Sequence, residues 1–165
     1  MDRDLQAFQD HDHSGCCESI LDTADRLAQE KSLRLTPVRR RVLEILTEAH
    51  QAMGAYDVLD RLREDGFGSQ PPVAYRALDF LVEHGLVHRI RRLNAFVACT
   101  DAGHDEHAPV FLICNECETV AELSGTATAK ALRQNAAAIG FQVSRMNIEA
   151  IGICPACAER SANAD

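Results

Sequence analysis

The stretch PPVAYRALDFLVEHGLVHRIRRLNAFVAC, residues 71–99, decides how the first half of the chain folds. It begins with proline, keeps apolar residues at helical spacing and reaches Gly85, and these features are typical of a helix with a defined start and end. After Gly85 the pattern changes to short runs rich in valine, isoleucine and phenylalanine. This change predicts two strands joined by a turn near Asn94.

Three further helices are expected before this stretch, because apolar residues recur there at spacings of three and four. Thr36 before Pro37 is a typical N-cap and first-turn pair, and Gly66 is typical of a helix end. The arginines at 39–41 are expected to face solvent. The three helices are expected over residues 18–31, from Pro37 onward and over 55–65. Capped helices followed by a basic ribbon are typical of a winged-helix domain, and a fragment of a generic α/β core is the alternative.

The second half of the chain is expected to form a small α/β domain. Strands are predicted on both sides of the turn in CNEC, a helix over 126–139, and one long strand over FQVSRMNIEAIGIC, residues 141–154. About 50 residues rarely bury a sufficient core, so a metal or a second copy is expected to stabilise this domain. The fold class is therefore α+β, and the expected divisions are a tail 1–17, a winged-helix domain 18–99, a hinge 100–109, the second domain 110–160 and a tail 161–165.

The composition excludes several classes of protein. Apolar residues make up 46% of the 165 residues, which is enough for a packed core. No apolar run approaches the ~18–20 residues that a membrane span needs. The first residues, MDRDLQAFQD, lack the apolar segment of a secretory signal, so a cytoplasmic location is expected. In that reducing compartment the seven cysteines favour metal binding or thiol chemistry over a disulfide framework.

The net charge of −8 is unevenly distributed along the chain. Residues 31–92 carry eleven basic and eight acidic residues, whereas the segments before and after them are acidic. A locally basic segment can bind the phosphates of nucleic acid even when the whole chain is acidic. The winged-helix domain is therefore the expected site of DNA contact.

Two CxxC pairs are the strongest chemical signal in the sequence. The two-residue spacer lets both thiolates of one pair reach the same ion, and two pairs supply the four sulfurs of a tetrahedral structural zinc site. A redox-active dithiol is the alternative, although a matched pair near both ends of one small domain favours metal. Four sulfurs leave no open position for catalysis. The four cysteines are Cys114, Cys117, Cys154 and Cys157.

A second set of metal-binding residue types lies near the junction of the two halves. Each residue alone is more often a surface histidine, a small buried residue or a solvated carboxylate. Together they offer nitrogen, sulfur and oxygen donors, a mixture that suits zinc. The set comprises His88, Cys99, His104, Asp105, Glu106, His107 and Glu122. A further group in the N-terminal tail is expected to be solvated, with metal binding as the alternative, and comprises His11, His13, Cys16 and Cys17.

Five motifs together resemble the ferric uptake regulator family, and within it the zinc-sensing branch. They are LRLTPVRRRVLEIL, AYDVLDRLRE, PPVAYRALDFLVEHGLVH, CNEC and CPAC, and the resemblance covers about residues 19–158. It implies a homodimeric, zinc-responsive transcriptional repressor with a winged-helix DNA-binding domain and a dimerisation domain held by structural zinc. It further implies two zinc ions per protomer and an AT-rich inverted-repeat operator in double-stranded DNA, at which zinc uptake genes are repressed.

The resemblance assigns the metal ligands. It implies that the four CxxC cysteines hold structural zinc and that His88, Cys99, His107 and Glu122 hold regulatory zinc. The segment GHDEHAPVFLIC has fewer histidines than the iron-sensing branch, and a cysteine ends the second wing strand, so zinc is favoured. An iron, manganese or peroxide sensor of the same family is the alternative. His104 and Asp105 are candidates for a third, weaker site.

The resemblance also places the DNA contacts. The recognition helix reads VAYRAL where the family has TVYRAL, so Val73 lacks a threonine hydroxyl, while Tyr75 and Arg76 are retained as base and backbone contacts. Asp60 and Arg63 are a candidate pair between two dimers on one operator. Neither an HExxH motif nor a phosphate-binding glycine loop occurs, which argues against a zinc hydrolase, and the basic domain argues against a plain zinc buffer. The expected phosphate contacts are Arg39, Arg40, Arg41, Arg89, Arg91 and Arg92.

Overall fold

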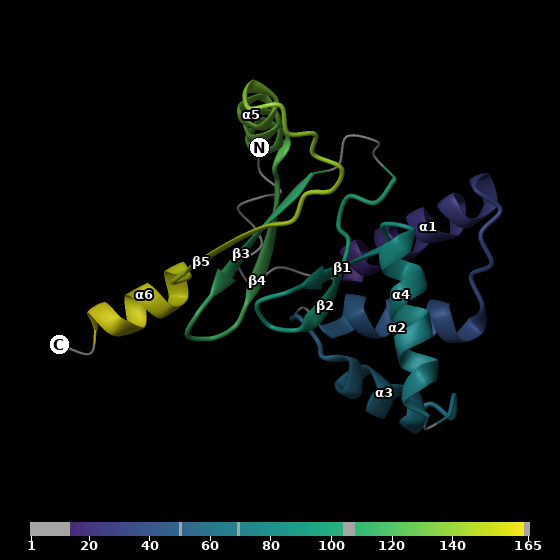
Figure 1. Ribbon diagram of the computed structural model, residues 1–165. Helices are drawn as coiled ribbons and strands as arrows, with labels where there is room; N and C mark the ends of the chain where they lie inside the picture. The colour runs from purple at the N-terminus through teal and green to yellow at the C-terminus, as the bar shows by residue number, and fades with distance from the viewer. Residues whose placement is uncertain (1–13, 50, 69, 104–107, 164–165) are drawn as a thin grey trace. The chain divides into compact units, whose positions relative to one another are not determined.

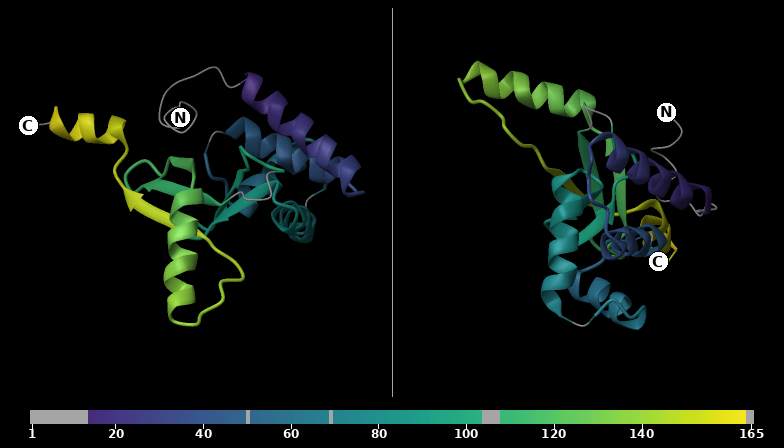
Figure 2. Two further views of the ribbon diagram at one scale, coloured as in Figure 1. Left: turned by 90° about the horizontal axis from the view of Figure 1, so that it is seen from above. Right: turned by 90° about the vertical axis from the view of Figure 1, so that its right-hand side faces the viewer.

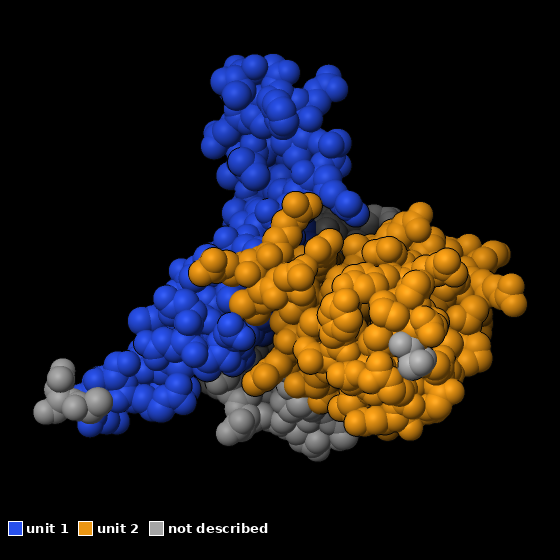
Figure 3. Space-filling view, turned by 60° about the horizontal axis from the view of Figure 1, so that its bottom comes forward, with its two compact units in different colours: residues 1–10, 104–165 blue, residues 11–103 orange. Residues whose placement is uncertain are grey.

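A computed structural model describes residues 14–49, 51–68, 70–103 and 108–163 (Figure 1, with further views in Figure 2). The chain divides into two compact units, coloured separately in Figure 3. We call their described parts the N-terminal unit, 14–103, and the C-terminal unit, 108–163. Within the described residues, no helix has both the length and the apolar character needed to cross a membrane.

The N-terminal unit is a winged-helix domain, as the sequence predicts. A bundle of helices is followed by an antiparallel hairpin in which His88 faces Val97 across the two strands. The backbone of Met53 exchanges two hydrogen bonds with Phe96, so the segment before α3 extends the hairpin. The elements are α1 (Ser14–Glu30), α2 (Pro37–Ala49), α3 (Ala55–Glu64), α4 (Pro71–Glu83), β1 (Val87–Ile90) and β2 (Ala95–Ala98).

The residues predicted to begin and end the helices, and to turn the hairpin, do so in the structure. Thr36 Oγ1 accepts a hydrogen bond of 3.4 Å from the Arg39 backbone N–H at the start of α2. Gly85 follows α4 with a φ of 71°, a left-handed conformation that suits glycine at a helix end. Asn94 has a φ of 48° and turns the chain between β1 and β2. Local sequence therefore sets the limits of these elements.

The core of this unit joins the inner faces of the helices to the hairpin. Val42 and Ile45 of α2 and Leu78 and Leu81 of α4 are fully buried, as their helical spacing predicts. Val82, four residues after Leu78 on the same helix, is half-buried and packs against this core. Burial of such side chains contributes about 1.5–3 kcal/mol each, so the core holds α4 firmly against α2.

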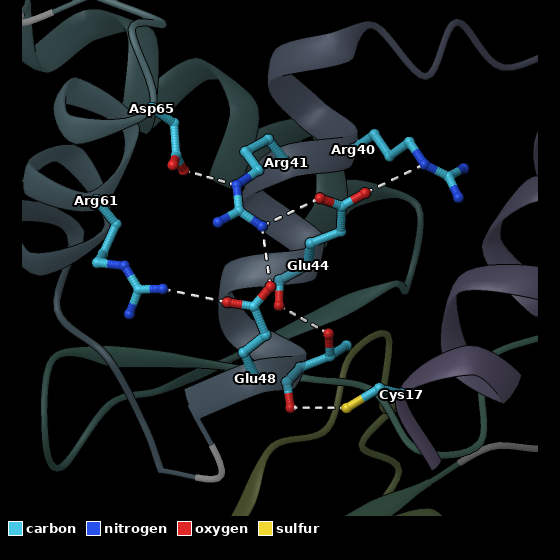
Figure 4. A network of polar contacts seen from close by, with 8 residues as sticks. Cys17, Arg40, Arg41, Glu44, Glu48, Arg61 and Asp65 are labelled. Carbon is cyan, nitrogen blue, oxygen red and sulfur yellow. Dashed lines mark hydrogen bonds and ion pairs between the residues drawn. The ribbon is translucent and has the colours of Figure 1, made fainter. Parts of the chain in front are cut away.

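Helix α1 begins earlier than the expected tail allows. It starts at Ser14, so the last four residues of the predicted tail 1–17 are helical. The physical reason lies at Cys17, which is half-buried and donates a hydrogen bond of 3.3 Å to the backbone carbonyl of Thr47 in α2 (Figure 4). Packing against α2 thus extends the helix. His11, His13 and the Cys16 side chain lie outside the described residues.

The C-terminal unit is a three-stranded mixed sheet with two helices. The strand order is β4-β3-β5, with β3 antiparallel to β4 and parallel to β5. Helix α5 projects away from the sheet in Figure 2, and only Ala129 of this helix is buried. The elements are β3 (Pro109–Cys114), β4 (Val120–Ser124), α5 (Thr126–Ala138), β5 (Ile148–Gly152) and α6 (Pro155–Ala162).

The sequence expectation of one long strand over residues 141–154 is wrong. Only Ile148–Gly152 pair, and their register runs from Val110 opposite Ile148 to Cys114 opposite Gly152. Pro109 begins β3 and has no backbone N–H to donate, so residues 141–147 meet no continuing partner strand. Helix α6 was not expected, and it extends into the predicted tail 161–165.

Replacing Gly125 with alanine is expected to destabilise the C-terminal unit by about 2 kcal/mol, through overpacking. A Cβ there would lie 2.3 Å from the Ala108 carbonyl oxygen, which accepts a hydrogen bond from the Gly125 N–H. Gly152→Ala is the matched control, because no atom lies within 4 Å of a Cβ at that position. Denaturant unfolding of the full chain measures both variants, and equal midpoints would contradict the expected clash.

Candidate functional site

Four cysteine sulfurs converge in the C-terminal unit. The Sγ atoms of Cys114, Cys117, Cys154 and Cys157 all lie within 4.8 Å of one another. The Cys117 and Cys154 sulfurs are 3.7 Å apart. Two sulfurs bound to one tetrahedral zinc at about 2.3 Å would be separated by about 3.8 Å. We call this set the four-cysteine cluster, and its donor type and spacing fit a closed structural zinc site.

Local backbone structure positions the four sulfurs. Cys114 ends β3, Cys117 lies in the turn before β4, Cys154 is the N-cap of α6 and Cys157 lies in the first turn of that helix. Asn115 N–H donates to the Gly152 carbonyl at 2.9 Å, which ties the first CxxC turn to the end of β5. Convergence of all four sulfurs on one point favours metal binding over a redox dithiol, which needs only one pair.

Hydrogen bonds and burial set the protonation of these thiols. Hydrogen bonds from backbone N–H groups, first that of Cys117 and then that of Cys154, lower the pKa of Cys114 to about 6. The hydrogen bond with the Thr119 side chain lowers the pKa of Cys117. Burial raises the pKa of Cys157. The first CxxC pair is therefore set to ionise more readily than Cys157, and the thiolate is the form that binds metal.

The residues expected to hold regulatory zinc are distributed over both units. His88 on β1 and Cys99 just after β2 belong to the N-terminal unit, where an imidazole nitrogen and the Cys99 sulfur lie within 4.8 Å of each other. Cys99 is buried and His88 half-buried. Glu122 lies on β4 of the C-terminal unit, opposite Phe111 and half-buried. His107 lies outside the described residues, as do His104 and Asp105.

Helix α4, which the sequence predicts to be the recognition helix, exposes the two residues that the sequence singles out. Tyr75 and Arg76 are both exposed near the start of this helix. Sequence reasoning missed Tyr56, which is 66% exposed at the start of α3 and packs edge-to-face with Tyr75, with ring centroids 6.4 Å apart. Two exposed aromatic rings beside an arginine can contact bases and sugars. The sequence does contain a signal for Tyr56, because this tyrosine lies in the first turn of the helix that precedes α4.

The arginines of α2 are engaged within the protein rather than facing solvent as expected. Arg39 donates to the Arg34 carbonyl at 2.7 Å, and its guanidinium carbon lies 3.6 Å from the centre of the Phe80 ring. Arg40 is ion-paired with Asp25, and with Glu44 at 3.3 Å. These three side chains of Arg39–Arg41 are half-buried.

Arg41 is the centre of a network of charges between α2 and α3 (Figure 4). It binds Asp65 at 2.6 Å, Glu48 at 2.9 Å and Glu44 at 3.1 Å. Arg61 joins the same network through Glu48 at 3.1 Å. We call these five residues the Arg41 network. Because its carboxylates already neutralise Arg41, a DNA phosphate would have to compete with them.

The wing carries the remaining expected phosphate contacts. Arg89 on β1 is exposed and donates to Asn94 Oδ1 at 2.8 Å, which orients it along the hairpin. Arg91 and Arg92 are exposed in the turn between the strands. On α3, Asp60 and Arg63 form an exposed ion pair of 2.8 Å within the helix.

Comparison with known proteins agrees with this architecture. A model of the ferric uptake regulator family matches residues 30–151. The zinc uptake regulation protein of Escherichia coli (strain K12) is 37% identical over 142 residues, which are 86% of this chain and 83% of that protein. The zinc uptake regulation protein of Shigella flexneri matches with the same identity and coverage.

Solved structures extend the similarity to three dimensions. A zinc uptake regulator complexed with zinc and DNA matches with a TM-score of 0.83 and 36% identity, over 88% of this chain and 97% of that one. The crystal structure of holo XcZur matches with a TM-score of 0.79 and 39% identity, over 86% and 98%. This chain therefore belongs to the ferric uptake regulator family, whose members regulate transcription and are not enzymes.

Proposed function

We propose that this protein is a zinc-responsive transcriptional repressor, which binds an AT-rich inverted-repeat operator as a zinc-loaded homodimer and represses zinc uptake genes. The observation that carries the proposal is the approach of a His88 nitrogen and the Cys99 sulfur to within 4.8 Å. These are zinc donors on the DNA-binding unit itself, separate from the four-cysteine cluster. The sequence similarity to zinc uptake regulation proteins supports the same function.

Two zinc ions per protomer have different tasks in this proposal. The four-cysteine cluster holds the structural ion, and His88, Cys99, His107 and Glu122 together hold the regulatory ion. Because the second set draws on both units, with residues 100–109 as the hinge, zinc there favours one arrangement of the units over others. Only an arrangement that fits two recognition helices to the operator binds DNA tightly. The affinity of the dimer for DNA therefore rises with the zinc concentration.

The DNA contacts of the proposal come from α4 and the wing. Tyr75, Arg76 and Tyr56 read the operator, and the arginines of the wing and of α2 contact phosphates. These are Arg39, Arg89, Arg91 and Arg92, with Arg40 and Arg41 only if their carboxylate partners are released. Neutralising phosphates releases counterions, so the affinity falls steeply with salt. A protein that acts on promoter DNA in this way is expected in the cytoplasm.

The homodimer is supported by the apolar surface of the C-terminal unit. Strand β5 is at one edge of the sheet, and among the described residues no strand pairs with its outer side. Large apolar side chains are exposed on this strand and directly after it, and on α5 and the segment that follows α5, which is rare for surfaces that meet only water. They are Leu132, Ile139, Phe141, Ile151 and Ile153. A second copy of the chain would cover these side chains.

Zinc-buffered DNA binding tests the function directly. The wild-type protein is titrated onto an AT-rich inverted-repeat duplex at free zinc concentrations set by a metal buffer, with iron and manganese as controls. Affinity is expected to rise with zinc alone. Cys99→Ser should remove this response while Cys17→Ser keeps it, because only Cys99 is in the proposed site. Equal affinity at all zinc levels would refute zinc sensing, and a response to iron instead would favour the iron-sensing alternative.

Two dimers on one operator are proposed through Asp60 and Arg63. Both side chains are more than half exposed, so their present ion pair can exchange for one with a neighbouring dimer. Asp60→Arg is expected to lower the cooperativity of DNA binding and Asp60→Arg with Arg63→Asp to restore it. A titration resolving one-dimer and two-dimer complexes measures this, and unchanged cooperativity in the single variant contradicts the pairing.

A further inference from the structure

Arg160 contacts the four-cysteine cluster without belonging to it. It lies on α6 three residues after Cys157, and its Nη2 donates a hydrogen bond of 2.7 Å to the Cys157 sulfur. Cys157 is fully buried, whereas Arg160 itself is exposed. The arginine therefore lies on the solvent side of the deepest sulfur of the cluster.

We propose that Arg160 is an outer positioning residue of the zinc site, which holds the Cys157 sulfur in place and slows the loss of zinc. The inference rests on the proposed binding of zinc by the four cysteines. Residues that hydrogen-bond metal ligands orient these ligands and contribute to metal affinity. Arg160 would orient the Cys157 sulfur, and both residues belong to the same helix.

The positive charge of Arg160 makes its hydrogen bond stronger than the other hydrogen bonds to the cluster. A zinc ion bound by four thiolates carries a net charge of −2, which must be offset in a partly buried site. The Cys154 N–H to Cys114 at 3.4 Å and the Thr119 hydroxyl near Cys117 at 3.1 Å are neutral partners. Arg160 adds a full positive charge, and a hydrogen bond between charged groups is about twice as strong as a neutral one.

The helical position of Arg160 explains the geometry. Residues three apart lie on the same face of a helix, so Arg160 follows Cys157 by about one turn. Cys154 and Cys157 are at the start of α6, where the helix dipole also favours thiolate. The first turn of α6 thus carries the second CxxC pair, and Arg160 contacts Cys157 from the next turn. A Cys157 sulfur that Arg160 holds in place stays in position to rebind zinc, so a chelator captures the ion more slowly.

The rate of zinc transfer to an excess of a chromophoric chelator tests the proposal on the full-length zinc-loaded protein. Arg160→Ala is expected to release zinc about tenfold faster, at the lower end of the effect of such partners because Arg160 is exposed. Arg160→Lys retains the charge but not the planar group, and should be intermediate. Arg133→Ala is the matched control, because it removes an exposed arginine of the same unit from α5.

Cobalt substitution separates a role at the sulfur from a general loss of stability. The sulfur-to-cobalt charge-transfer bands should shift in Arg160→Ala and stay unchanged in Arg133→Ala, while thermal unfolding shows that both loaded variants are folded. Equal rates and spectra for Arg160→Ala and wild type would overturn the role of Arg160. Full retention of the cluster zinc by Cys157→Ser would instead overturn zinc binding by these cysteines, so the two failures are distinct.

Discussion

Cys157→Ser is expected to abolish zinc binding at the four-cysteine cluster and to unfold the C-terminal unit. A serine hydroxyl stays protonated at neutral pH and is a poor zinc ligand. Structural zinc contributes about 10–16 kcal/mol of binding free energy, which in small domains is folding free energy. The unit has few other sources of stability, because its sheet is small and α5 buries only Ala129. Metal analysis after desalting, with amide hydrogen exchange over residues 108–163, measures both effects.

Cys17→Ser is the matched control for that substitution. Cys17 lies on α1 and its only described partner is the Thr47 carbonyl at 3.3 Å, to which a serine hydroxyl can also donate. We expect a loss below about 1 kcal/mol and an unchanged content of cluster zinc. A Cys157→Ser protein that kept its zinc and its exchange protection would show that the cluster does not hold the metal.

Arg41→Ala is expected to destabilise the N-terminal unit by about 3 kcal/mol. The substitution leaves Glu44, Glu48 and Asp65 close together without the guanidinium that binds all three. Arg41 is 21% exposed, and breaking a fully buried ion pair costs roughly 3–5 kcal/mol. The expected loss of stability is at the lower end of this range because Glu48 is 46% exposed. Urea unfolding followed by circular dichroism measures it.

The comparison variant is Arg91→Ala, which removes an exposed arginine of the wing turn. Its stability should change little, while its DNA affinity falls and the salt dependence of binding becomes shallower by about one phosphate contact. Arg41→Ala should keep the wild-type salt dependence under conditions where it is folded. The reverse pattern, with normal stability but a shallower salt dependence for Arg41→Ala, would place Arg41 on a phosphate as the sequence predicts.

Features determined by neighbouring residues could be predicted from the sequence. Thr36 with Pro37 begins α2, and Gly85 ends α4 in the left-handed conformation that glycine favours. The CxxC spacing predicted two thiolate pairs, and the structure brings their sulfurs within 4.8 Å. In each case the physical signal is contained within a few residues.

Features that depend on distant partners could not be predicted in this way. The arginines of α2 are expected to face solvent, but one of the carboxylates that neutralise Arg41 is Asp65, which follows α3 and is 24 residues away in the sequence. Residues 141–147 have the composition of a strand, but β3 begins at Pro109 and offers them no partner. The edge-to-face contact of Tyr56 with Tyr75 likewise joins two helices.

The order of the cysteines along the chain has a consequence for protein synthesis. Strand β3 and the first CxxC pair leave the ribosome well before β5 and the second pair, which are their partners in the sheet and in the four-cysteine cluster. The winged-helix unit is complete by then and can fold first. A nascent chain can therefore fold its DNA-binding unit before all four cysteines of the cluster are available. Zinc can bind all four only after translation has passed Cys157.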